Sequence, residues 1–167
     1  MAEKVAVISK SITYSGLFSV REIFKLIDGW LEQHGWDKIE ASHKEIVAEK
    51  GKEINISLEP EKKENDYVKS ILYIDITMTE VEDVVVKKGK KEISLNKGEV
   101  EISLDAKLVT DHEGKWVQSP LHMLAKAAYD KFIKKSEIDA FKEKLSKATT
   151  HLSEQIKAHL NLFQYQK

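Results

Sequence analysis

Six histidines are the side chains best suited to acid–base or metal chemistry near neutral pH, and they are scattered along the chain. His151 and His159 are eight residues apart, about two helical turns, which is too far for adjacent side chains to share an ion. The chain has no cysteine, which excludes disulfides, zinc–thiolate sites, iron–sulfur clusters and cysteine nucleophiles. The sequence therefore predicts no metal site and no cofactor.

His112 is the histidine with carboxylates on both sides, since it lies between Asp111 and Glu113. A histidine in such surroundings can act as a general base. No nucleophile or second base is placed with it, and polar residues before Gly114 are also typical of an ordinary turn. We predict no catalytic residue, and the sequence favours a protein that is not an enzyme.

The charges are balanced, with 27 basic and 28 acidic residues and a net charge of -1. Arg21 is the sole arginine, although arginine is the preferred side chain for bidentate phosphate and guanine contacts. The glycines form neither a dinucleotide-binding pattern nor a P-loop. Nucleic acid is therefore not an expected partner, and the lysine clusters at 87–91 and 131–135 are interpreted as solvated turns and helix ends.

Apolar periodicity predicts an α+β fold in a single domain, 1–167, with a strand-rich part over 1–118 and a helical segment over 119–167. A helix over 17–34, or one that starts later from a cap at Ser19, follows the first strand. Alternating apolar residues and short connections predict a mostly antiparallel sheet of about six strands. Seven segments have strand patterns from which this sheet would form: 4–14, 39–48, 54–58, 67–79, 81–86, 93–95 and 100–108.

Strand 67–79 is apolar on one face and carries Tyr73 and Asp75 on the other. If this second face lines a cavity, Tyr73 and Asp75 would be its polar groups, and Trp116 from the loop before the helical segment would border it. The alternative, which the clean alternation of the other strands favours, is the solvent side of the sheet. We keep the three residues as candidate ligand contacts.

The helical segment opens with Ser119 as a cap and Pro120, and a new helix is predicted near 134–136. Phe141, Leu152 and Phe163 recur every eleven residues, which is typical of a straight apolar stripe. From Ile138 to Phe163 the helix would span about 39 Å, whereas a strand of usual length spans roughly 17–20 Å. The stripe should therefore overhang, and we expect a partner to contact Ile156, Leu160 and Phe163.

Strand, helix, several antiparallel strands and a long C-terminal helix together resemble the helix-grip arrangement of START and Bet v 1-like proteins. The resemblance covers the whole chain and rests on the order of elements. It implies a curved sheet wrapped around the last helix, and members of these families commonly hold an apolar ligand between the two.

The leading hypothesis is a noncatalytic binding protein that holds an apolar small molecule or a protein partner between the sheet and the C-terminal helix. One alternative is a self-assembling protein that forms homo-oligomers through this helix, and another is a cyclase-like enzyme with a helix-grip cavity. The first residues lack the basic start and apolar run of a signal peptide, and no apolar run reaches about 18 residues. We expect a cytoplasmic protein without a transmembrane segment.

Overall fold

The predicted α+β class is confirmed by a computed structural model, which describes residues 3–110, 119–132 and 134–164. The protein contains a six-stranded antiparallel sheet that packs against helices. Within the sheet the strand order is β1-β6-β5-β3-β2, and β4 pairs with β5. The elements are β1 (Glu3–Phe18), α1 (Val20–Gln33), β2 (Glu40–Ala48), β3 (Gly51–Leu58), β4 (Glu61–Lys63), β5 (Val68–Lys88), β6 (Lys91–Thr110), α2 (Pro120–Phe132) and α3 (Lys134–Gln164).

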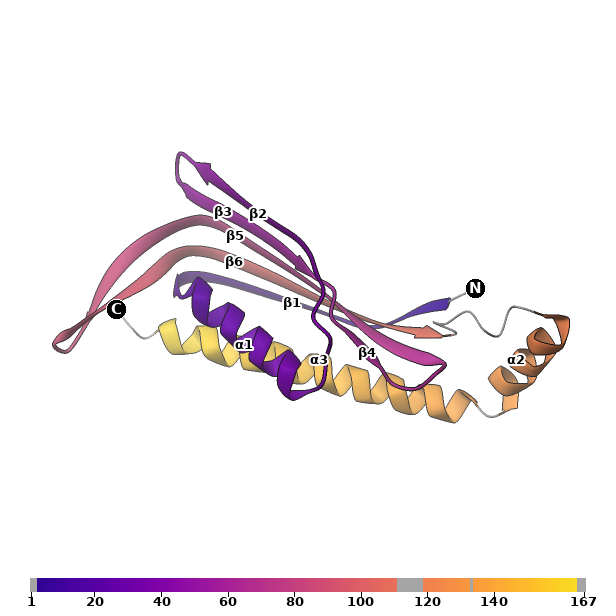
Figure 1. The fold of residues 1–167 in the computed structure, drawn as a ribbon. Helices are drawn as coiled ribbons and strands as arrows, with labels where there is room; N and C mark the ends of the chain where they lie inside the picture. Colours follow the sequence, from indigo (N-terminus) through magenta and orange to yellow (C-terminus); the bar gives the residue numbers. More distant parts are fainter. Residues whose placement is uncertain (1–2, 111–118, 133, 165–167) are drawn as a thin grey trace.

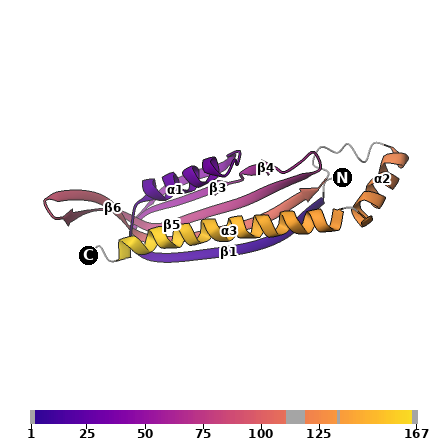
Figure 2. The same cartoon turned by 90° about the horizontal axis from the view of Figure 1, so that it is seen from below.

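Helices α1 and α3 lie side by side on one face of the sheet (Figures 1 and 2). Ser19 caps α1, because its hydroxyl accepts a hydrogen bond from the backbone N–H of Glu22 at 3.3 Å. The break before α3 falls where the sequence predicts a new helix. A long C-terminal helix against an antiparallel sheet is compatible with the helix-grip arrangement.

Strands β5 and β6 are longer than the periodicity indicates, with 21 and 20 residues. Each joins two of the predicted strands into one, and the register of the pair shifts between Thr79 and Glu82. Glu80 has a φ of 53° at this bulge. A Cβ on Gly98 would lie 2.7 Å from the carbonyl oxygen of Thr79. A residue without a side chain therefore lets β6 pass the bulge of β5 closely.

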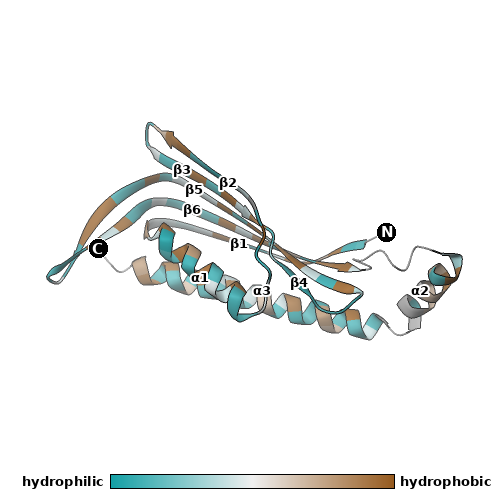
Figure 3. Ribbon diagram, viewed as in Figure 1, coloured by the Kyte–Doolittle hydropathy of each residue, from teal (hydrophilic) through white to brown (hydrophobic). Residues whose placement is uncertain are grey.

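The hydrophobic core is a continuous cluster between the sheet and the two helices. Along the strands, hydrophobic and hydrophilic residues alternate (Figure 3), which directs one set toward the helices. Its largest fully buried side chains are Phe18, Ile23, Ile27, Leu31, Leu72, Ile74, Ile76, Met78, Ile102, Leu104, Leu108 and Leu152. Among the described residues, no helix is both long and apolar enough to cross a membrane.

Candidate functional site

Hydroxyls and carboxylates form rows across the sheet face that lies away from α1 and α3. Cross-strand partners share a face, so the register of the strands decides which side chains become neighbours. One row joins Ser9, Asp105 and Tyr73, and the next joins Ser11, Ser103, Asp75 and Ser57. The side chains of Ser9 and Asp105 are hydrogen-bonded.

Tyr73 and Asp75 lie on this outer face, because the intervening Leu72, Ile74 and Ile76 are buried on the helix side. The ammonium of Lys4 lies 3.4 Å from the Tyr73 hydroxyl, and that of Lys107 lies 4.9 Å from the centre of the Tyr73 ring. Ser57 Oγ donates a hydrogen bond of 2.6 Å to Asp75 Oδ1.

The two residues are thus neighbours of each other, but they face away from α3. Their positions agree with the solvent-side interpretation of the strand pattern. Trp116, the third candidate ligand contact, lies outside the described residues. A role in ligand binding stays a prediction for all three.

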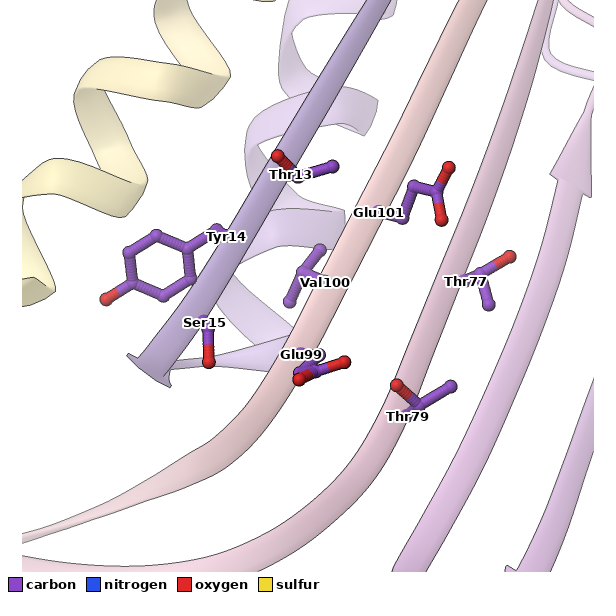
Figure 4. A pocket seen from close by; sticks show the side chains of 8 residues that line it. All are labelled: Thr13, Tyr14, Ser15, Thr77, Thr79, Glu99, Val100 and Glu101. Atoms are coloured by element: carbon purple, nitrogen blue, oxygen red, sulfur yellow. The ribbon is translucent and has the colours of Figure 1, made fainter.

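A depression of about 330 Å³ lies further along the same face (Figure 4). Glu101 stands between Thr13 and Thr77 in one cross-strand row, and Glu99 stands beside Thr79 in the next. Its lining residues are Thr13, Tyr14, Ser15, Thr77, Thr79, Glu99, Val100 and Glu101. Carboxylates and hydroxyls of this kind can hold a polar ligand by hydrogen bonds.

Two histidines that are far apart in the sequence meet where α1 packs against α3. Trp30 Nε1 donates a hydrogen bond of 2.9 Å to His151 Nδ1, and the ring of His34 stacks on Trp30 with 4.3 Å between centroids. The rings of His34 and His151 are 5.8 Å apart. In the described part of the chain, no three histidine, aspartate or glutamate side chains form a group that could hold a metal. These contacts instead join the two helices.

The predicted partner contacts on α3 belong to the protein's own core. Ile156 is 0% exposed, and Leu160 and Phe163 are also buried. Within the same turns, Leu162 is 68% exposed and points the other way. Binding of a partner by these three residues stays a prediction, because in the folded protein Leu162, and not these three, is the exposed large apolar side chain on α3.

Helix α2 carries the largest group of neighbouring exposed apolar side chains that we find in the described residues. Leu121 is 76% exposed, Met123 is 56% exposed and Leu124 is 70% exposed. The helix extends past the end of the sheet (Figure 1) and packs against α3. The exposure of these side chains follows from the position of α2 beyond the sheet (Figure 1).

Comparison of the sequence with models of protein families and with curated proteins found no match. The functional proposals below therefore depend on the geometry of this chain alone.

Proposed function

We propose that this is a noncatalytic binding protein and that α2 is the element that docks on its protein partner. The observation that carries the proposal is the exposure of Leu121, Met123 and Leu124 on one short helix. Neighbouring apolar side chains without cover are typical of an interaction surface. An amphipathic helix commonly binds by laying such residues into an apolar groove of its partner.

The charge of α2 and of the start of α3 indicates the kind of partner. Lys126, Asp130 and Lys131 lie in α2, and Lys134 and Lys135 are the first two residues of α3. A groove with apolar walls and an acidic rim would complement this segment, and opposite charges would increase the rate of association.

The interior of the fold supports a partner on the surface over an apolar small molecule. Leu72 and Leu104 of the sheet and Leu152 and Ile156 of α3 are fully or almost fully buried in the same core cluster. Buried apolar side chains from the sheet and from α3 therefore occupy the region in which the helix-grip resemblance implies a ligand.

The test uses the double variant Leu121→Glu/Leu124→Glu. Both side chains are exposed, so the fold should be retained, whereas a partner groove would have to bury two carboxylates. Leu162→Glu is the control, because it introduces one glutamate at a similarly exposed position on α3. Wild-type protein and both variants are immobilised in parallel to capture proteins from the cells that make this chain.

Some captured proteins should bind the wild type and Leu162→Glu but not the double variant. Each such candidate is then purified and titrated by calorimetry. We expect at least tenfold weaker binding to the double variant, and weaker binding of the wild type at high salt. If purified candidates bind the double variant as well as the wild type, α2 is not the docking element. If sedimentation instead shows α2-dependent dimers, the occupant is a second copy and the self-assembly alternative replaces this proposal.

A further inference from the structure

Beyond the register shift, β5 and β6 continue as a two-stranded hairpin that leaves the body of the protein (Figures 1 and 2). Pairing continues to the tip, where Lys88 stands opposite Lys91 and Gly89 occupies the turn with a φ of 65°. This paired projection is separate from α2, which lies at the other end of the molecule (Figure 1).

The tip carries a local excess of positive charge. Lys87, Lys88, Lys90 and Lys91 are all exposed, and none forms an ion pair with a residue in the described part of the chain. Glu92 is the sole carboxylate between residues 84 and 95. Like charges directly opposite each other destabilise a strand pair, so the Lys88–Lys91 pair carries a cost that a bound anionic surface would offset.

Apolar side chains follow directly behind the lysines, and Figure 3 shows the hydrophobic band next to the hydrophilic tip. Val84 pairs with Leu95, and Val86 pairs with Ile93. Val85 on the opposite side is 67% exposed. An exposed aliphatic side chain beside a cationic tip can add apolar contact where the hairpin lies along the surface of a bilayer.

We propose that the tip of this hairpin binds the anionic headgroups of a lipid membrane. Lysines near such a surface are attracted by its negative potential. Nucleic acid fits less well, because the hairpin has no arginine and because no phenylalanine, tyrosine or tryptophan occurs between positions 74 and 115 to stack on bases. The acidic Glu80, Glu82 and Asp83 at its base restrict the contact to the tip.

Sedimentation of the whole protein with vesicles tests the proposal. Vesicles of phosphatidylcholine alone are compared with vesicles that also contain phosphatidylglycerol. Each lysine near an anionic surface contributes a factor of about five to the partition coefficient, so Lys88→Gln/Lys91→Gln should lower it by about 30-fold. Lys25→Gln/Lys157→Gln is the matched control, since both lysines are exposed on the helices and the charge change is identical.

Wild-type protein should bind the anionic vesicles, lose binding as salt increases, and bind the neutral vesicles weakly. The control variant should bind as the wild type does, and Val85→Asn should reduce binding several-fold because an apolar contact is lost. The proposal is overturned if the tip variant binds like the control, or if wild type shows no preference for anionic vesicles. Fluorescence anisotropy with single-stranded and duplex RNA completes the test, since tip-dependent RNA binding without vesicle binding would replace the lipid with nucleic acid.

Discussion

Replacing Ile156 with alanine should strongly destabilise the protein, because this side chain is 0% exposed between α3 and the sheet. The change removes three carbon atoms, worth about 2.4 kcal/mol of transfer free energy. The cavity left behind raises the loss to about 2–5 kcal/mol. Alanine favours a helix over isoleucine by up to about 0.5 kcal/mol, so we expect the free energy of unfolding to fall by about 2–4 kcal/mol.

Denaturant unfolding followed by circular dichroism measures this difference, and a thermal scan should show a decrease in Tm of roughly 5–15 °C. Leu162→Ala in the same helix is the control and should change the free energy of unfolding by less than about 0.5 kcal/mol, because Leu162 is largely exposed. Equal, small effects of both substitutions would refute the packing of α3 on the sheet. They would also indicate that Ile156 is exposed, as the partner contact predicted from the sequence requires.

Two glycines should respond in opposite directions to alanine. Gly98→Ala should cost about 1–3 kcal/mol, because its Cβ would meet the backbone of Thr79 and Glu80 at 2.7 and 3.0 Å. Gly29→Ala should stabilise α1 by about 0.5–1 kcal/mol, since no atom outside the local backbone of the helix lies within 4 Å of the new Cβ. Denaturant midpoints of the two variants measure both effects, and similar values would contradict the close approach of β5 and β6. Burial raises the pKa of the Tyr14 phenol, whose hydroxyl donates a hydrogen bond of 2.6 Å to the Leu17 carbonyl. The unfolded chain then releases this proton at a lower pH than the folded protein, so the free energy of unfolding should fall as the pH rises above about 10. Unfolding at successive alkaline pH values should show a shallower fall for Tyr14→Phe, and identical slopes would exclude this contribution.

Local patterns in the sequence were sufficient for the fold class. Alternation of apolar residues located the longer strands, and Ser19 located the start of α1. The pattern did not reveal that 67–79 and 81–86 belong to one strand. A bulge adds one residue, so that odd-numbered residues face the core on one side of it and even-numbered residues on the other. The apolar pattern of one continuous strand then looks like the patterns of two strands.

The candidate site was harder to predict from the sequence than the fold class, because its residues become neighbours only through the register of the sheet. Asp75 is flanked by Ser57 and Ser103 because three strands align at one level, and no local spacing encodes that alignment. His34 and His151 likewise meet through the packing of two helices. The sequence indicated that Tyr73 and Asp75 share a face, but which face the helices cover depends on the whole fold.

The sequence predicted that α3 would extend past the sheet, because a long helix was compared with strands of usual length. The observed strands are longer, and a different element extends from the protein. At about 3.3 Å per residue, the 16 residues of β1, the strand that α3 contacts most, extend over roughly 53 Å, whereas the 31 residues of α3 extend over about 46 Å. The sheet is therefore longer than the helix and covers its stripe through Phe163. The element without cover is the hairpin at residues 82–97, and its lysine tip is therefore the end of the molecule to test for a partner surface, together with α2.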